Sequence, residues 1–303
     1  SSVPNIEQFG RFSPFIFKGT VFSTGGYSAL YGQALSSALI LESIDLPEQS
    51  SANLGISIIG LSAGYQQLAK NKKSSWGGSY SYTNLAPAFA VIKQNQDYST
   101  IPSYHNADAN FRIKTSKTGM LKYYGYFSSN KLAFTSESID SLGYYDKFSL
   151  SNTNIYHNLS WKENLPNKWK LITGISYSNN KDAIAGRMQN ENKADILLAN
   201  LETKNFNVDT KGDYFNAKLV LEKRLRGISG IRLGAEHNLS NDRLWYTSFS
   251  GQKFQNVLKE NITSAFAESD LYITNDLALK GGIRFEHSSL LAKTNIAPRA
   301  SLA

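Results

Sequence analysis

Apolar and polar residues alternate along most of this chain from about residue 50 onward. In the stretch ADANFRIK, Ala107, Ala109, Phe111 and Ile113 take every second position, and polar residues take the positions between them. The same period of two recurs in KLITGISYS (170–178), FNAKLVLEK (215–223), IRLGAEHNL (231–239) and LKGGIRFE (279–286). Side chains on a strand point alternately to its two faces, so each stretch predicts a strand with one apolar and one polar face.

Alternation alone fits a soluble sandwich as well as a membrane barrel. Three features favour the barrel. The alternating segments often run beyond the ordinary strand length of about 5–6 residues. Short turns such as TSKTGM and LRGISG alternate with long polar connections such as KQNQDYSTIPSYHN and NNKDAIAGRMQNENKAD. Aromatic residues gather toward segment ends, as an interfacial girdle requires; they are Trp76, Tyr80, Tyr82, Trp161, Trp169, Trp245 and Tyr246.

The composition agrees with the barrel. Charged residues make up 18% of the 303 residues, against a usual fraction of about 25%, and aromatic residues reach 12%. No apolar run approaches the roughly 18 residues of a membrane helix, whereas a barrel strand needs only about 9–11 residues. We therefore predict an all-β fold, a transmembrane antiparallel β-barrel, with a soluble β-rich binding module as an alternative.

About ten strands are expected, with an eleventh beginning near residue 297. Their predicted ranges are 52–66, 75–92, 104–116, 119–136, 147–163, 168–182, 198–224, 229–248, 253–274 and 277–293. The apolar parity switches between Ile58 and Ile59, which indicates either a β-bulge or two short strands. The choice between these two structures decides at which end of the barrel the segment Ala69–Ser75 lies, and the sequence does not settle that choice.

The sequence contains no recognisable catalytic constellation, so we expect no enzyme and no cofactor. Cysteine is absent, which excludes disulfides and thiolate sites. GGYSALYG lacks the Gly-Lys-Ser/Thr of a phosphate loop, and the zincin and nucleophile-elbow patterns are missing. His105 and Asp108 come closest to a metal-ligand pair, and polar residues facing a wet interior are the favoured interpretation. The net charge of +8 is scattered, with its densest cluster at Lys70, Lys72 and Lys73, so no nucleic-acid partner is expected.

The stretch FSTGGYSALYGQALSSALILESIDLP, residues 22–47, differs in character from everything after it. It resembles the end of the plug domain of TonB-dependent outer-membrane receptors. Near the other end, NITSAFAESDLYITNDLALKGGIRFEHSSL and TNIAPRASLA resemble that family's strand–turn–strand pattern, with Gly-x-Arg-Phe-Glu followed by Asn-x-x-Pro-Arg. With the strand series between them, the resemblance covers essentially the whole chain.

The resemblance implies an N-terminal plug inside a 22-stranded barrel. Residues 1–49 would be the C-terminal part of the plug, and 50–303 a partial barrel. A barrel of about ten strands has no room for a plug, and lipid does not tolerate an open sheet edge, so further strands are expected. A fragment or a longer protein is therefore expected, and the TonB box is not in this sequence.

The resemblance also implies active import of a scarce nutrient, such as an iron chelate, cobamide, oligosaccharide or peptide, across the bacterial outer membrane. The implied partners are outer-membrane lipid, TonB, an unidentified small ligand and a surface lipoprotein. A passive porin or structural barrel is the alternative. The candidate plug-turn residues are Gly25, Gly26, Tyr27, Tyr31 and Gly32. The candidate lumen-facing charges, which would grip the plug or simply be solvated, are Arg112, Lys114, Arg232, Glu236, Arg284 and Glu286.

Overall fold

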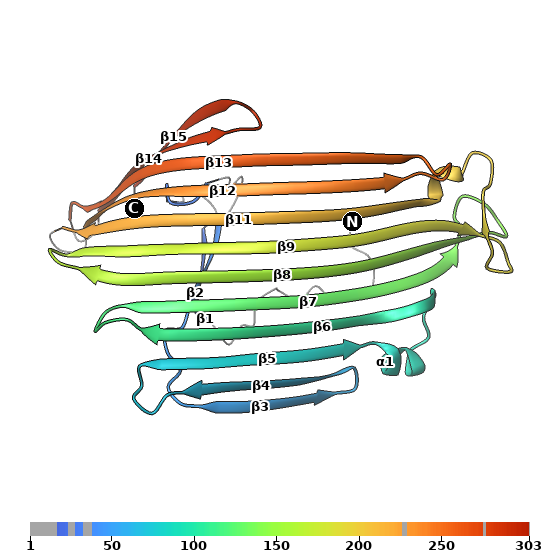
Figure 1. The fold of residues 1–303 in the computed structure, drawn as a ribbon, viewed down its shortest axis with the longest axis horizontal. Helices are drawn as coiled ribbons and strands as arrows, with labels where there is room; N and C mark the ends of the chain where they lie inside the picture. The colour runs from blue at the N-terminus through green and yellow to red at the C-terminus, as the bar shows by residue number, and fades with distance from the viewer. Residues whose placement is uncertain (1–16, 24–27, 33–37, 226–228, 275–276, 303) are drawn as a thin grey trace.

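The computed structural model describes residues 17–23, 28–32, 38–225, 229–274 and 277–302 (Figure 1). Two N-terminal strands, β1 (Phe17–Ser23) and β2 (Ala38–Ser43), form a small antiparallel sheet of their own. A 13-stranded sheet contains the other strands. These are β3 (Ser51–Ser57), β4 (Gly60–Leu68), β5 (Ser74–Asn84), β6 (Asp97–Lys114), β7 (Met120–Glu137), β8 (Tyr145–Leu165), β9 (Trp169–Gln189), β10 (Asp195–Ile196), β11 (Phe206–Arg224), β12 (Gly230–Thr247), β13 (Lys253–Tyr272), β14 (Ala278–Ser288) and β15 (Lys293–Leu302).

The large sheet is an antiparallel meander in which strands that follow one another along the chain are hydrogen-bonded neighbours. Its order runs β15-β14-β13-β12-β11-β9-β8-β7-β6-β5-β4-β3, with the short β10 paired to β9 off this path. Within the described residues, β3 and β15 are therefore the two end strands. The predicted all-β antiparallel architecture is confirmed.

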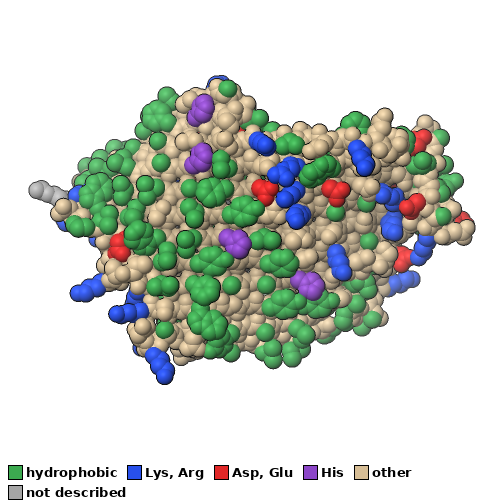
Figure 2. All heavy atoms as spheres, in the orientation of Figure 1, with side chains coloured by type: hydrophobic (Ala, Val, Ile, Leu, Met, Phe, Trp, Pro, Cys, Tyr) green, Lys and Arg blue, Asp and Glu red, His purple; other side chains and the backbone are tan. Residues whose placement is uncertain are grey.

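The two faces of the sheet differ in the way that the alternation predicts. On one face, Leu54 and Ile56 are each 75% exposed, and Phe111, Ile175 and Leu219 are also exposed. On the other face, Arg112 and Arg284 are buried, at 4% and 2% exposure. The sheet thus turns its apolar face outward and its polar face toward β1 and β2, which lie behind it in Figure 1. Figure 2 shows the apolar side chains spread over this outer face.

The outer apolar surface forms a band whose height suits a bilayer. On β9 it runs from Trp169 to Tyr177, and on β12 from Ile231 to Leu239, which is the roughly nine residues that a tilted membrane strand needs. Trp76, Trp161 and Trp169 stand near the strand ends that meet the short turns, as a girdle requires. The prediction is wrong for Tyr246, which shares the inner face with Glu236 and stacks on Phe206.

The parity switch at Ile58 and Ile59 is a two-residue hairpin turn, because Ser57 pairs with Gly60 as β3 turns back into β4. The alternative of two short strands is therefore correct. Consequently the segment from Ala69 to Ser75 lies on the rim of the short turns 115–119 and 166–168. In outer-membrane barrels the short turns face the periplasm.

Other predicted strand bounds need correction. The predicted strand 198–224 begins only at Phe206, after β10 and the 3₁₀ turn η2 (Glu202–Lys204). The long connections expected at 93–106 and 179–195 are shorter, because β6 already begins at Asp97 and β9 continues to Gln189. Beyond the membrane both faces of a strand meet water, so the apolar alternation that marks a strand ends there. The backbone hydrogen bonds between neighbouring strands continue past that point.

Helix is scarce in the described part of the chain. The helix α1 (Ala86–Val91) has six residues, with a proline near its start, and it connects β5 to β6. None of the described helices is long and apolar enough to cross a membrane.

Candidate functional site

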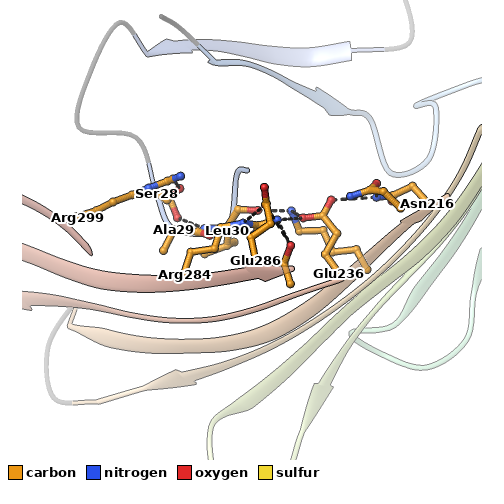
Figure 3. A network of polar contacts seen from close by, with 11 residues as sticks. Ser28, Ala29, Leu30, Asn216, Glu236, Arg284, Glu286 and Arg299 are labelled. Carbon is orange, nitrogen blue, oxygen red and sulfur yellow. Dashed lines mark hydrogen bonds and ion pairs between the residues drawn. The ribbon is translucent and has the colours of Figure 1, made fainter. Parts of the chain in front are cut away.

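Residues 28–32 form a tight turn that lies against the inner face of the large sheet, and we call them the N-terminal turn. The amide of Tyr31 donates to the carbonyl of Ser28 at 3.1 Å, which closes the turn. The amide of Leu30 donates to the hydroxyl of Ser28 at 3.2 Å. Figure 3 shows this turn in the concavity of the sheet, facing side chains of the late strands.

Glu268 on β13 binds the start of the N-terminal turn. Its carboxylate accepts the hydroxyl of Ser28 at 2.8 Å and the amide of Ala29 at 2.7 Å. The Glu268 side chain is only 1% exposed, and Arg232 on β12 pairs with it at 3.1 Å. One buried carboxylate therefore satisfies two donors of the turn, and a neighbouring guanidinium balances its charge.

Three cations of the sheet bind the carbonyl groups of the same turn. Arg284 donates to the carbonyl of Ala29 at 3.4 Å. Lys218 on β11 donates to the carbonyl of Leu30, and Arg299 on β15 donates to that of Ser28. A backbone carbonyl can accept a hydrogen bond whatever side chain its residue carries. These three contacts therefore depend on the backbone path of the turn and not on its side chains.

Arg284 is the centre of a polar network on the inner face of β12, β13 and β14, which we call the wall (Figure 3). Its guanidinium donates to Glu236 at 3.0 Å, to Ser264 at 2.8 Å and to Glu286 at 3.1 Å. Its side chain is 3% exposed. Such deep burial of a charge is tolerated only with near-complete pairing, so the network fixes the wall that the turn contacts.

A small apolar surface, which we call the apolar seat, receives the tip of the turn. Ala29 is fully buried against Val220 and Phe266, at 3% and 4% exposure, with Leu30 and Ile172 packed beside them. The register pairs Ile172 with Val220, Val220 with Gly234 and Gly234 with Phe266, so the seat is one row across four strands. A Cβ on Gly234 would lie 2.5 Å from Cζ of Phe266 and 2.5 Å from the carbonyl oxygen of Leu219, so glycine is needed both for the ring position and for the close approach of the strands.

The end of the turn is close-packed as well. A Cβ on Gly32 would lie 2.5 Å from Nη2 of Arg284, which leaves no space for a side chain. The ring of Tyr31 faces the ammonium of Lys218 at 5.1 Å, a cation–π contact. Burial raises the pKa of the Tyr31 hydroxyl; Arg232 lowers it and Glu268 raises it further.

A second contact holds the chain just before it enters the large sheet. Lys122 on β7 pairs with Asp45 at 2.6 Å and donates to the carbonyl of Ser43 at 3.0 Å. The residues after β2 are thus tied to the middle of the sheet, while the N-terminal turn is tied to β11–β15.

The family described as TonB dependent receptor-like, beta-barrel matches residues 114–303. The chain belongs to the TonB-dependent receptor family. Its location is accordingly the bacterial outer membrane. No match is found among the curated proteins.

Solved structures of outer-membrane receptors and transporters share the fold of this TonB-dependent receptor chain. The alcaligin receptor FauA of Bordetella pertussis is 10% identical with a TM-score of 0.60, over 95% of this chain and 46% of FauA. The ferripyoverdine receptor of Pseudomonas aeruginosa is 10% identical with a TM-score of 0.61, over 89% of this chain and 41% of that protein. The copper transporter OprC is 10% identical with a TM-score of 0.60, over 96% of this chain and 49% of OprC. The chain thus spans less than half the length of these proteins.

Four of the six predicted lumen-facing charges of this TonB-dependent receptor chain meet in one place. Arg232, Glu236, Arg284 and Glu286 all belong to the network around the N-terminal turn. Arg112 is buried on the inner face but apart from that network, 3.5 Å from Gln66. Lys114 lies at the end of β6 and is exposed. Their grip on a plug remains a proposal.

Of the predicted plug-turn residues, Tyr31 and Gly32 lie in the N-terminal turn, whereas Gly25, Gly26 and Tyr27 fall outside the described residues. Sequence reasoning missed Lys218, Glu268 and Arg299, which contact the turn directly. A signal existed for the seat: Ile172 and Val220 are apolar residues at positions of the polar face, and these interruptions of the alternation mark the place where the turn packs.

The structure separates the suspected metal pair. His105 faces outward and lies 2.8 Å from the hydroxyl of Tyr80, whereas Asp108 lies on the inner face. Residues three positions apart on a strand point to opposite faces, as His105 and Asp108 do. The prediction that both face a wet interior was therefore wrong for His105. Among the described residues, no group of three or more His, Asp or Glu side chains is placed to hold a metal ion.

At the long-loop rim of the receptor chain, Lys204 joins two loops. Its ammonium pairs with Asp140 at 2.6 Å and with Asp146 at 2.7 Å. Desolvation lowers the pKa of Lys204, but the hydrogen bonds and charges of the two carboxylates outweigh it and raise the pKa overall. The ammonium therefore stays charged at any physiological pH and keeps the loop 190–205 against the loop 138–144.

Proposed function

We propose that this chain is the end of the plug and the first half of the barrel of a receptor that actively imports a scarce nutrient. In this proposal residues 1–49 belong to the plug and residues 50–303 to a barrel of 22 strands. The shares of 41–49% that the chain covers in its structural relatives support a half-length barrel. A transporter of this family has no need of a catalytic site.

The contact between the N-terminal turn and the wall carries the proposal. A barrel of 22 strands would leave an aqueous hole if its lumen were empty. On the lumen side Lys218, Arg284 and Arg299 donate charge-assisted hydrogen bonds to the turn at residues 28–32, and Glu268 accepts two from it. Each such bond contributes about 1.5–3 kcal/mol at most, and each can be exchanged for water. The turn is therefore held firmly while remaining releasable.

In this proposal the ligand binds from outside, between the long loops and the plug. TonB then pulls on the N-terminal part of the plug, and the wall contacts of the turn break and re-form. The structural relatives include receptors for alcaligin and ferripyoverdine and a copper transporter. We accordingly place the nutrient in the class of scarce metals and their chelates, while a cobamide, an oligosaccharide or a peptide stays open.

A passive porin is the competing function. Its lumen needs only solvated polar residues, and the apolar seat of Ile172, Val220 and Phe266 would expose apolar surface to water without purpose. The seat, filled by Ala29, therefore favours a plugged barrel.

Conductance tests the proposal without knowledge of the ligand. The full-length protein is inserted into planar bilayers in molar KCl, next to a variant that lacks the plug through residue 49. We expect the full-length protein to conduct almost no current and the deletion variant to form large, steady channels. Steady conductance of the full-length protein, equal to that of the deletion variant, would identify a porin instead.

A further inference from the structure

Three cations lie side by side on three neighbouring strands, on the outer face of the sheet, and we call them the cationic row. The register pairs Lys181 on β9 with Lys211 on β11, and Lys211 with Arg243 on β12. Side chains directly opposite on antiparallel strands have Cβ atoms about 4.5–5.5 Å apart, and like charges there destabilise the pair. The sheet thus carries a local repulsion that the fold itself does not require.

The carboxylates around the cationic row offset only part of its charge, although Asp213 interacts electrostatically with both Lys211 and Arg243. Asp213 pairs with Arg243 at 3.6 Å and is already bonded by Tyr177 at 2.8 Å and Asn179 at 2.7 Å. The ion pairs of the described residues include neither Lys181 nor Lys211. The outer-face charges of this region are the cations Lys181, Lys211, Arg243 and Lys259 and the carboxylates Asp209 and Asp213, a net charge of +2.

The row is confined to one side of the sheet. On the neighbouring strands the same row continues as Thr153 on β8 and Ser129 on β7, which are uncharged. Figure 2 shows the corresponding cluster of blue and red side chains on the outer face, beside a surface dominated by apolar side chains. Further along the same face Lys147 is paired in register with Arg187, and that second cation pair has a carboxylate, Asp195, 3.8 Å from the Arg187 guanidinium.

The height of the row above the apolar band indicates its surroundings. The band ends at Tyr177 on β9, and Lys181 follows on the same face four residues later, about 13 Å along the strand. For a strand tilted about 45° this is about 9 Å along the membrane normal. The polar headgroups occupy roughly 5–8 Å beyond the hydrocarbon on each side, within reach of a lysine or arginine side chain.

We propose that Lys181, Lys211 and Arg243 form a binding site for a phosphate-bearing lipid headgroup of the outer leaflet. The acyl chains of that lipid lie on the apolar band below the row, and its phosphate lies between the three cations. The bound anion removes the repulsion between the paired cations, and Arg243 supplies a planar fork that fits phosphate. The proposal rests on the membrane location of the chain and not on nutrient import.

The test uses the full-length protein, purified in detergent, and lipid A as the probe, a phosphorylated glycolipid. Retained lipid is measured by native mass spectrometry for the wild type and for the triple variant Lys181→Gln/Lys211→Gln/Arg243→Gln. The matched control is Lys70→Gln/Lys73→Gln/Lys117→Gln, which removes the same charge from exposed positions of the short-turn rim. Heat-dependent migration in SDS gels verifies that each variant is folded.

We expect the triple variant to bind lipid A on the order of 100-fold more weakly, and the control variant to bind like the wild type. Phosphatidylcholine should not replace lipid A, and millimolar inorganic phosphate should not displace it. If both variants lose lipid A equally, the loss follows from the lower net charge of the protein and not from these three positions, and the proposed site is wrong. Undiminished binding by the folded triple variant, or displacement by inorganic phosphate alone, would overturn it as well.

Discussion

Gly32 and the guanidinium of Arg284 are in such close contact that a single added carbon at Gly32 would lie 2.5 Å from Nη2. Arg284 cannot retreat easily, because Glu236, Ser264 and Glu286 all accept its N–H groups. The path of the N-terminal turn is thus fixed by the wall, and glycine is the residue that permits it.

Gly32→Val should therefore detach the turn. Overpacking costs about 1–3 kcal/mol, so the undocked population should rise about 5- to 150-fold. The chain has no cysteine, so Leu30→Cys alone reports the change through its rate of reaction with a maleimide. Gly281→Val is the control, because nothing lies within 4 Å of a Cβ there. Unchanged reactivity in Gly32→Val would contradict the contact.

Glu268→Gln should weaken the docking of Ala29. The amide replaces one of two carboxylate oxygens by a donor, so either Ser28 or Ala29 loses its acceptor, at a cost of about 1–3 kcal/mol. Hydrogen exchange at the Ala29 amide should accelerate by about 5- to 150-fold. Glu260→Gln, on the same strand and bonded to Ser288, should leave this exchange unchanged. Equal acceleration in both variants would point to a general loosening of β13 instead.

Gly234→Ala should disturb the apolar seat through the ring of Phe266. The new methyl group would lie 2.5 Å from Cζ of Phe266 and 2.5 Å from the carbonyl oxygen of Leu219. The ring must therefore turn away from Ala29 and the strand must shift, at a cost of about 1–3 kcal/mol. Maleimide labelling of Leu30→Cys should again speed up, and a second change, Phe266→Leu, should restore part of the protection. Gly230→Ala is the matched control, since its nearest neighbour would be 3.4 Å away. Failure of Phe266→Leu to restore any protection would show that the ring of Phe266 does not transmit the change and would leave the carbonyl of Leu219 as the site of the clash.

Ala29→Cys/Gly282→Cys should lock the turn to the wall. A Cβ at Gly282 lies 3.1 Å from that of Ala29, close to the roughly 3.5–4.5 Å of a disulfide. If release of the turn opens the barrel, urea should raise the KCl conductance of the reduced full-length variant but not of the oxidised one. Equal conductance in both forms would place the opening movement elsewhere in the plug.

Single cysteines should reveal the orientation of the sheet. Lys70→Cys lies on the short-turn rim and Glu191→Cys on the long-loop rim. A membrane-impermeant maleimide added to whole cells should label the cysteine at 191 and spare the one at 70, because short turns face the periplasm. After cell lysis both should react, and the opposite pattern in whole cells would reverse the assignment of the rims.

The strands and the two faces of the sheet can be predicted from the order of residues alone. Alternation is a local property of one strand, so each residue's face follows from its neighbours, as for Phe111 outside and Arg112 inside. The N-terminal stretch and the Gly-x-Arg-Phe-Glu motif also sufficed to recognise the family. Simple parity could even have excluded a metal pair of His105 and Asp108.

Which inner-face residues act together depends on the folded sheet. Ile172, Val220 and Phe266 lie far apart in the chain, and the cross-strand register brings them into one row under Ala29. The same register sets Lys181, Lys211 and Arg243 side by side. Register and docking depend on long-range pairing and on close packing between separate segments, and the periodicity of a single strand contains neither.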